Sequence, residues 1–208
     1  SGGCIKGIIK VPGDKSISHR AIILGSIAKG TTYITGFLEG EDSLATLQAF
    51  RDMGVVIEGP NDGNIKIYGV GLNGLKQPPG PLYLGNSGTS MRLLSGLLSA
   101  QLFDVVLTGD ESLSKRPMGR VVTPLKMMGA FIEADESGLP PLKIKGNEVL
   151  NSIYYELPMA SAQVKSCILL AGLYVKSNTI VKESATTRDH TERMLSVFGC
   201  KISKDNST

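Results

Sequence analysis

The sequence predicts an α/β fold (α+β in some classification schemes) with three repeated βαβαββ units that pack around buried helices. One observation is a segment that occurs three times, in which a helical apolar pattern, a glycine and a β-rich run follow one another. The shared glycines are Gly54, Gly129 and Gly199, and a glycine here is typical of a helix that ends before a strand. A second observation is the first helix of each unit, which is apolar nearly all round and is therefore expected inside the core.

The first unit covers about residues 5–69 and opens on a β-like run that ends at Pro12-Gly13. Asp42 is expected to cap the second helix, because aspartate accepts hydrogen bonds from unpaired N–H groups at a helix start. A polar turn at 60–64 is expected to join the last two strands. We expect helices at Ser16–Ala28 and Asp42–Met53, and strands at Ile5–Val11, Thr31–Thr35, Val55–Ile57 and Ile65–Tyr68.

The second unit covers about residues 82–146. Pro117 suits the first turn of a helix, where its missing N–H group is not needed. A polar turn at 135–141 separates two short apolar runs, which is the pattern of a hairpin. We expect helices at Ser87–Ser99 and Pro117–Met128, and strands at Phe103–Thr108, Phe131–Glu133 and Leu142–Lys145.

The third unit covers about residues 152–208 and lacks its closing strand. Asp189 and Glu192 have the spacing of a capping box, in which two side chains bind backbone N–H groups at a helix start. Because this unit stops early, the repeat predicts that the chain is a fragment of a longer protein. We expect helices at Ser161–Tyr174 and Asp189–Phe198, and strands at Thr179–Lys182 and Cys200–Ser203.

The composition is typical of a soluble globular protein, with 41% hydrophobic and 20% charged residues. Apolar runs stay shorter than the ~18 residues that a membrane span needs. The net charge of +3 is mild, the basic residues are scattered and aromatic residues are few, so nucleic-acid binding is disfavoured. Three distant cysteines indicate neither a disulfide framework nor a zinc site, and with no other metal-ligand spacing we expect no metal and a cytoplasmic location.

A small polar cluster opens the first helix of each unit, at 14–16, 85–89 and 160–163. Three helix starts around one axis would direct N–H groups and helix dipoles at one region, which would form an anion site. Arg116 and Arg188 precede the second helices of their units, and a guanidinium group is a natural partner for carboxylate or phosphate. Taken singly, each cluster also fits a simple N-cap and each arginine a surface residue.

Five blocks of the sequence, in order, resemble the 5-enolpyruvylshikimate-3-phosphate synthase (3-phosphoshikimate 1-carboxyvinyltransferase) family. The resemblance implies the N-terminal domain, residues 1–208, of a two-domain enzyme with the enolpyruvyl transferase-like fold, whose C-terminal domain is absent. The blocks are Pro12-Gly13-Asp14-Lys15-Ser16-Ile17-Ser18-His19-Arg20-Ala21, Leu84-Gly85-Asn86-Ser87-Gly88-Thr89-Ser90-Met91-Arg92, Lys115-Arg116-Pro117-Met118, Ser161-Ala162-Gln163 and Thr187-Arg188-Asp189-His190-Thr191-Glu192.

The resemblance also implies the reaction, in which the enolpyruvyl group of phosphoenolpyruvate moves to the 5-hydroxyl of shikimate 3-phosphate and phosphate is released. It implies no cofactor, and it makes the missing C-terminal domain a partner that supplies the acidic catalytic residues. The fragment alone is expected to be inactive. Both substrates carry several negative charges, which positioned lysine and arginine side chains would offset.

Site residues follow from the resemblance by motif. The resemblance implies that Lys15 is catalytic. The chemistry agrees, since a lysine among other cations has its charged form disfavoured, which suits proton transfer. Ala162 stands where some members have a second serine, and Gly88 keeps the small residue associated with binding of glyphosate. The residues implied for shikimate 3-phosphate are Lys15, Ser16, Arg20, Ser161, Ala162, Gln163 and Arg188. Those implied for phosphoenolpyruvate are Lys15, Asn86, Gly88, Arg116 and Gln163.

Two alternatives stay open at the level of the sequence. A UDP-N-acetylglucosamine enolpyruvyl transferase is similar in repeat architecture, although the block from Asp14 to Arg20 favours shikimate 3-phosphate as the substrate. A non-catalytic anion-binding module of the same fold is the other alternative.

Overall fold

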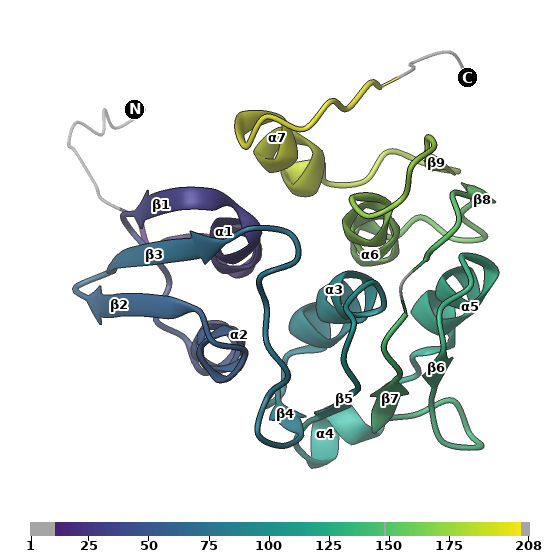
Figure 1. Ribbon diagram of the computed structural model, residues 1–208, viewed down its shortest axis with the longest axis horizontal. Coiled ribbons are helices and arrows are strands. Elements are labelled where there is room, and N and C mark those ends of the chain that lie inside the picture. Colours follow the sequence, from purple (N-terminus) through teal and green to yellow (C-terminus); the bar gives the residue numbers. More distant parts are fainter. Residues whose placement is uncertain (1–10, 148, 205–208) are drawn as a thin grey trace, which may run out of the picture.

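The computed structural model describes residues 11–147 and 149–204, so the expected strand at Ile5–Val11 lies outside the described residues except for its last one. Helices α1 (Lys15–Ile27), α3 (Gly88–Leu98) and α6 (Ala162–Gly172) lie at the centre, and sheets and further helices surround them (Figure 1). In these helices 10 of 13, 9 of 11 and 7 of 11 residues are buried. By contrast, helix α7 (His190–Val197) buries 2 of 8 residues. The fold is thus a mixed α/β domain whose central helices form the core.

The first sheet has the strand order β1-β3-β2, with both pairs antiparallel. Its strands are β1 (Lys29–Ile34), β2 (Val56–Asn61) and β3 (Asn64–Val70). Ile65 and Ile67 of β3 are buried, as expected of alternate residues on the face of a sheet that packs on the core. Helix α2 (Glu41–Asp52) packs with α1 beside this sheet. The turn predicted at 60–64 is shorter than expected, since β2 continues to Asn61.

The second sheet has the order β4-β5-β7-β6, in which β4 and β5 are parallel and the other pairs are antiparallel. Its strands are β4 (Leu82–Tyr83), β5 (Val105–Thr108), β6 (Ile132–Glu133) and β7 (Leu142–Ile144). The short helix α4 (Glu111–Ser114) was not predicted, and α5 spans Gly119–Met127. Pro117 is therefore outside the helix that it was expected to begin. The backbone N–H of Met118 binds Gly138 O at 2.9 Å, which ties this loop to the turn before β7.

The third sheet pairs β8 (Tyr154–Glu156) with β9 (Ile180–Lys182) in parallel. The strand predicted at Cys200–Ser203 is not formed. Its first N–H group, that of Cys200, donates to Leu195 O at 3.0 Å and so completes the end of α7. Among the described residues no hairpin strand follows that could pair with 200–203, and a lone strand gains no ladder hydrogen bonds.

The three repeated glycines have the conformation that the sequence predicts. Their φ angles are +86° at Gly54, +88° at Gly129 and +85° at Gly199, which is the left-handed region that favours glycine. Each one lies just after the last turn of α2, α5 or α7. The glycine therefore ends the helix and turns the chain away from its axis.

Neither expected acidic cap binds a backbone N–H group through its side chain. Residue Gly40 is the N-cap of α2, and Asp42 lies in the first turn, where its carboxylate pairs with Lys15. Asp189 is at the N-cap of α7, but its carboxylate accepts a hydrogen bond from Arg193 Nε at 2.9 Å and caps no N–H group. In each case the carboxylate binds a nearby cation instead of a backbone N–H group.

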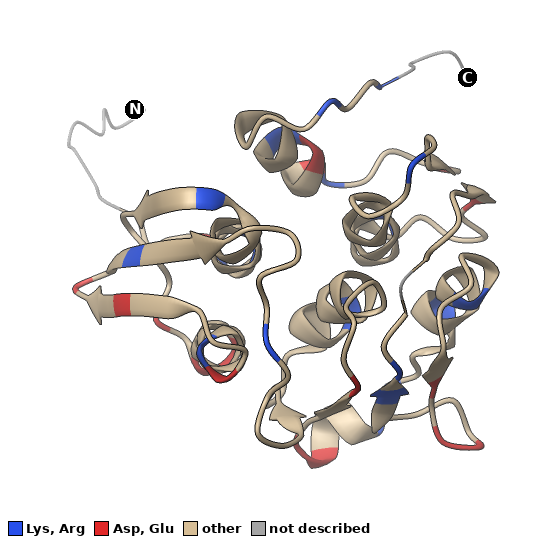
Figure 2. Ribbon diagram, in the orientation of Figure 1, with Lys and Arg blue, Asp and Glu red and all other residues tan. Residues whose placement is uncertain are grey.

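Charged side chains are distributed over most elements, and Figure 2 shows lysine and arginine on the first two sheets and several helices. In the described part of the chain, no helix is long and apolar enough to cross a membrane. Within residues 11–147 and 149–204, no cluster of three or more metal-ligating side chains occurs.

Candidate active site

The loop before α1 has one position, Gly13, at which only glycine fits. A Cβ atom added to Gly13 would lie 1.9 Å from Gly36 O, so a larger residue would displace the backbone. Asp14 Oδ1 accepts a hydrogen bond from Ile17 N at 2.8 Å and caps the helix. Ser18 Oγ accepts another from Leu38 N at 3.0 Å, which fixes the first turn of α1 against the loop before α2.

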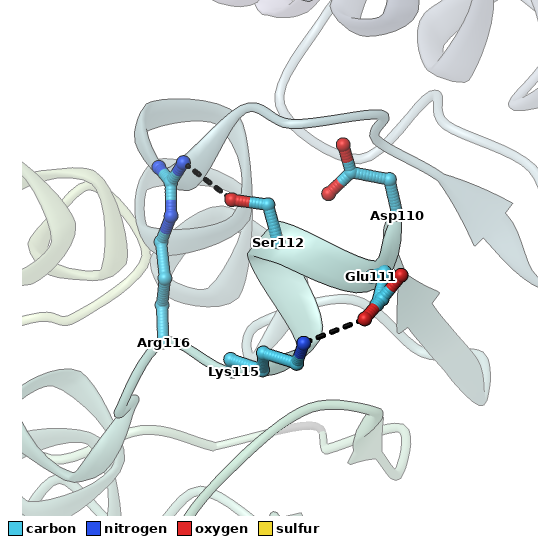
Figure 3. A pocket seen from close by; sticks show the side chains of 5 residues that line it. All are labelled: Asp110, Glu111, Ser112, Lys115 and Arg116. Atoms are coloured by element: carbon cyan, nitrogen blue, oxygen red, sulfur yellow. Dashed lines mark hydrogen bonds and ion pairs between the residues drawn. The ribbon is translucent and has the colours of Figure 1, made fainter.

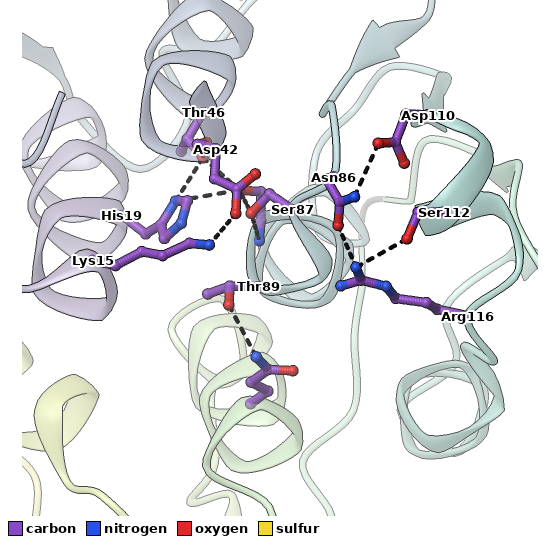
Figure 4. A network of polar contacts seen from close by, with 12 residues as sticks. Lys15, His19, Asp42, Thr46, Asn86, Ser87, Thr89, Asp110, Ser112 and Arg116 are labelled. Carbon is purple, nitrogen blue, oxygen red and sulfur yellow. Dashed lines mark hydrogen bonds and ion pairs between the residues drawn. The ribbon is translucent and has the colours of Figure 1, made fainter. Parts of the chain in front are cut away.

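Lys15 extends from this first turn and forms an ion pair with Asp42 of α2. Its side chain is 53% exposed, whereas that of Asp42 is 17% exposed. The expectation that Lys15 stands among cations is therefore incomplete, because its ammonium group has a carboxylate partner. The pair holds the ammonium group at the surface beside the N-terminal ends of α1 and α3 (Figure 4).

A buried chain of hydroxyl groups links α1, α2 and α3 through His19 (Figure 4). The Nδ1 atom of His19 lies 2.8 Å from Thr46 Oγ1 and 3.3 Å from Ser90 Oγ. Ser90 Oγ in turn donates to Ser87 Oγ at 2.6 Å, and Ser87 is the N-cap of α3. Burial lowers the pKa of His19 to about 4, so the ring is neutral at pH 7.

Arg116 lies beside the N-terminal end of α3, although 30 residues separate it from Asn86. Its Nη2 atom donates to Asn86 Oδ1 and, at 3.3 Å, to Ser112 Oγ of α4. Asn86 Nδ2 donates to Asp110 Oδ2 at 3.0 Å, which orients the amide (Figure 4). The sequence-predicted pair Asn86 and Arg116 is thus brought together.

Gly88, the first residue of α3, faces two guanidinium groups. A Cβ atom at this position would lie 2.8 Å from Arg92 Nη1 and 3.2 Å from Arg116 Nη1. Burial, together with the charges of Arg116 and Arg120, lowers the pKa of Arg92. None of these three arginines takes part in a salt bridge within the described residues. The result is uncompensated positive charge at the positive end of a helix dipole, which is suited to an anion.

An open depression of about 650 Å³ lies on the other side of Arg116, along α4. Figure 3 shows Arg116 bonded to Ser112 and, at the far end, Lys115 paired with Glu111 at 2.6 Å. Arg116 is only partly buried and lines this depression, which is open to solvent.

Gln163 connects the start of α6 to α3. Its Oε1 atom accepts from Arg92 Nη1 at 2.8 Å, and its Nε2 atom donates to Thr89 Oγ1 at 2.9 Å. Ser161 Oγ caps α6 by accepting from Val164 N at 3.3 Å, and Ala162 is the first residue of the helix. The N-terminal ends of α3 and α6 therefore lie side by side, as the three polar clusters suggest.

Arg20 of α1 is buried, with 5% of its surface exposed. It donates from Nε to Thr191 Oγ1 at 2.6 Å, from Nη2 to Ser166 Oγ at 2.8 Å and from Nη1 to Ser16 O at 3.0 Å. Burial lowers its pKa. Two of its five N–H groups lie beyond these three bonds, so Arg20 still has donors for a ligand.

Arg188 precedes α7 and is exposed, and its charge helps to lower the pKa of Arg20. It is therefore near Arg20 but has no place in the hydrogen-bond network just described. Sequence reasoning missed Arg92 as a residue of this region, and it named no role for the ion-paired cluster of Lys165 with Glu183 and Glu192. For Arg92 a signal existed, since it follows Gly88 by four residues and so shares its helix face.

The EPSP synthase (3-phosphoshikimate 1-carboxyvinyltransferase) family model matches residues 1–208. The 3-phosphoshikimate 1-carboxyvinyltransferase of Nitrosococcus oceani is 64% identical over 206 residues, which are 99% of this chain and 46% of that protein. The protein of the same name from Ruthia magnifica is 68% identical over 198 residues, or 95% of this chain and 45% of that protein. The chain thus spans about half the length of the curated relatives it matches.

Two solved structures of EPSP synthase from Acinetobacter baumannii match the fold with a TM-score of 0.94. Their sequences are 63% identical to this one, and the match covers 96% of this chain and 45% or 46% of those chains. Sequence and fold agree over nearly the whole length, and this chain belongs to the EPSP synthase family.

Proposed function

We propose that this chain supplies half of the active site for transfer of the enolpyruvyl group from phosphoenolpyruvate to the 5-hydroxyl of shikimate 3-phosphate. The observation that carries the proposal is the position of Arg116 beside Gly88 and Asn86, at the N-terminal end of a buried helix. The names of the relatives, 3-phosphoshikimate 1-carboxyvinyltransferase, support the same reaction. They also favour it over transfer to a UDP-sugar.

The chain is, in this proposal, the N-terminal domain of a two-domain enzyme, with three βαβαββ units packed around α1, α3 and α6. The parallel pairs β4–β5 and β8–β9 support it, since each pair flanks one of these helices in the second and third units. So do the matching helix ends at Gly54, Gly129 and Gly199. Coverage of about half of each relative is consistent with one domain of two.

Phosphoenolpyruvate binds, we infer, at the N-terminal end of α3. Arg116 and the N–H groups of the first turn of α3 would bind its carboxylate or phosphate, and Asn86 would keep Arg116 oriented. Gly88 leaves the space in which an anion can approach both arginines. Arg92 adds positive charge from the same helix face, and it orients Gln163 toward the same region.

Shikimate 3-phosphate binds between α1 and α6. Arg20, Ser161 and Gln163 would supply hydrogen-bond donors, with Ser16 and Ala162 at the two helix starts. Arg188, which is exposed, would close on the phosphate from the loop before α7. The substrate would then bridge helices that Arg20 and Gln163 already link by hydrogen bonds.

These residues contribute positioning and charge, and Lys15 would in addition transfer a proton. The reaction adds the 5-hydroxyl to the enolpyruvyl double bond and then eliminates phosphate, and negative charge grows on the leaving phosphate. Arg116 and Lys15 would stabilise that charge, which is the contribution that positioned cations make to such transition states. Lys15, already paired with Asp42, can exchange a proton with the substrate while Asp42 keeps its side chain in place.

The test combines this chain with the remaining half of the enzyme and follows phosphate release. The chain alone is expected to be inactive, and the combined halves are expected to turn over both substrates. Arg116→Ala should weaken phosphoenolpyruvate binding by roughly 10- to 100-fold, the usual loss for a charged hydrogen-bond donor. Arg193→Ala, an exposed arginine paired with Asp189 at 2.9 Å, is the matched control and should have no effect.

Three results would count against the proposal. Turnover by the 208 residues alone would exclude the half-site. Binding of UDP-N-acetylglucosamine in preference to shikimate 3-phosphate would assign another acceptor. An unchanged rate in the Lys15→Ala and Arg116→Ala variants would leave an anion-binding module without catalysis.

A further inference from the structure

Lys165 is a buried cation for which the proposed reaction has no use. It lies in α6, and 4% of its surface is exposed. Its Nζ atom is 2.6 Å from Glu192 Oε1 of α7 and 2.9 Å from Glu183 Oε2, which follows β9. Burial alone would lower the pKa of Lys165, but the hydrogen bonds to Glu192 and Glu183 raise it above the ordinary value. The side chain is therefore charged and held by two carboxylates.

The neighbouring residues form a second link between the same two helices. Ser166 Oγ of α6 lies 2.6 Å from Thr191 Oγ1 of α7, and Arg20 of α1 donates to both hydroxyl groups. The Lys165–Glu192 pair is thus one residue away, on each helix, from the contacts that fix Arg20. A shift of α7 relative to α6 would move both partners of Arg20 apart.

Apolar packing does little to hold this end of α7. Thr191 and Leu195 are its only buried residues, and Leu195 lies one helical turn further along. The first turn of α7 therefore depends on the ionic link of Glu192 and the hydroxyl of Thr191. Arg188 directly precedes this first helical turn, so its position depends on the same two contacts.

The charged groups of this region act on one another. Glu183 and Glu192 carry two negative charges, and Lys165 carries one positive charge. Arg20 supplies the second positive charge, and the charge of Glu192 acts on it to raise its pKa against the lowering effect of burial. One carboxylate oxygen, Glu192 Oε2, is buried without a hydrogen-bond partner in the described structure. Loss of Lys165 would leave two partly buried carboxylates together without their shared cation, and they would repel each other.

We propose that Lys165, with Glu183 and Glu192, is a positioning group for shikimate 3-phosphate: it fixes the first turn of α7 and so sets the place of Arg20 and Arg188. This inference rests on the proposed function, because it takes Arg20 and Arg188 as ligands of that substrate. Lys165 itself contacts no substrate. It acts through the helix that carries Thr191 and Arg188.

The experiment measures both KM values and kcat in the enzyme that combines this chain with its second half. Lys165→Met should raise the KM for shikimate 3-phosphate by roughly 10- to 100-fold, as small displacements of binding groups do. The KM for phosphoenolpyruvate should stay near that of the unaltered enzyme, because Arg116 and Asn86 lie on other elements. Lys182→Met is the matched control, since Lys182 pairs with Glu156 at 3.1 Å on the surface, and it should change neither KM.

A second variant keeps the test decisive if Lys165→Met does not fold. Glu183→Gln removes one charge and keeps a side chain that can accept from Lys165, and it should raise the KM for shikimate 3-phosphate by a smaller factor. Equal changes of both KM values, or a lower melting temperature with both KM values unchanged, would overturn the inference. If the unaltered enzyme itself fails to use shikimate 3-phosphate, the proposed function fails instead.

Discussion

The two halves of the central helices are held by different forces. In their far halves α3 and α6 pack so closely that a Cβ atom on Gly96 would lie 2.1 Å from Cys167 O. In their first turns the same helices meet through the side chains of Arg92, Gln163 and Thr89, at 2.8 Å and 2.9 Å. Apolar contact is insensitive to charge, whereas the polar end depends on protonation and on ligands. The protein therefore has a stable core at one end of these helices and a polar surface able to receive anions at the other.

The largest expected effect is at the apolar end. Gly96→Ala would bring a methyl group against the backbone of Cys167, and neither helix can yield without moving apart. We expect a loss of roughly 3 kcal/mol in the free energy of unfolding, the upper end for overpacking. Urea denaturation measures it. Gly172→Ala is the control, since the added atom would lie at an ordinary 3.4 Å from Thr179 Cβ, and an equal loss in that variant would contradict the argument.

A smaller effect is expected from acid at the polar end. Burial lowers the pKa of His19 from 6.5 to about 4, so the folded protein favours the neutral ring and the unfolded chain binds the proton first. The contribution of the neutral His19 ring to the free energy of unfolding is then fully present above pH 6.5, and it is lost as the pH drops toward 4. Between pH 7 and pH 5 the contribution of His19 should fall by about 2 kcal/mol.

Unfolding measured at both pH values, in the unaltered protein and in His19→Gln, isolates this contribution. The variant has no titrating group at this position and should lose about 2 kcal/mol less than the unaltered protein over the same interval. If the free energy of unfolding fell equally with pH in both proteins, His19 would not be the cause of the loss.

Gly88→Ala separates binding from stability at the polar end. The new methyl group would press on the ends of two flexible side chains, Arg92 and Arg116, which can move away. Stability should therefore change little, while phosphoenolpyruvate binding in the combined enzyme should weaken roughly tenfold, or about 1.4 kcal/mol. Gly119→Ala at the start of α5 is the control. No atom lies within 4 Å of the added group, so neither stability nor phosphoenolpyruvate binding should change. A large loss of stability in Gly88→Ala would show that the arginines cannot move.

The smallest expected effect is the loss of a helix N-cap, and it is tested by comparing the N-cap residues of α6 and α7. Ser161 Oγ accepts from Val164 N, so Ser161→Ala should cost about 1 kcal/mol, whereas the side chain of Asp189 caps nothing. Asp189→Ala removes only an exposed pair with Arg193, so it should cost less than the lost cap of α6. Thermal unfolding of the two variants ranks them, and the reverse order would be inconsistent with the observed caps.

The sequence by itself determined the features that depend on neighbours along the chain. Glycine alone adopts a positive φ without strain, so Gly54, Gly129 and Gly199 predict three helix ends that are confirmed. The apolar pattern likewise predicts which helices are buried. Local rules failed where a distant charge competes: Asp42 binds Lys15 instead of capping α2, and Glu192 binds Lys165 instead of closing a capping box.

Only the tertiary structure decided which polar groups meet. Arg20 and Thr191 are 171 residues apart in the sequence, and Gln163 and Arg92 are 71 apart, yet both pairs are bonded. No helix or strand period extends over such distances, because these contacts depend on how closely whole helices pack. The close approach at Gly96 brings α3 and α6 together, and an ion pair between Lys165 and Glu192 links α6 to α7. The motifs could therefore name the candidate site residues, but the packing of the helices determines what those residues contact.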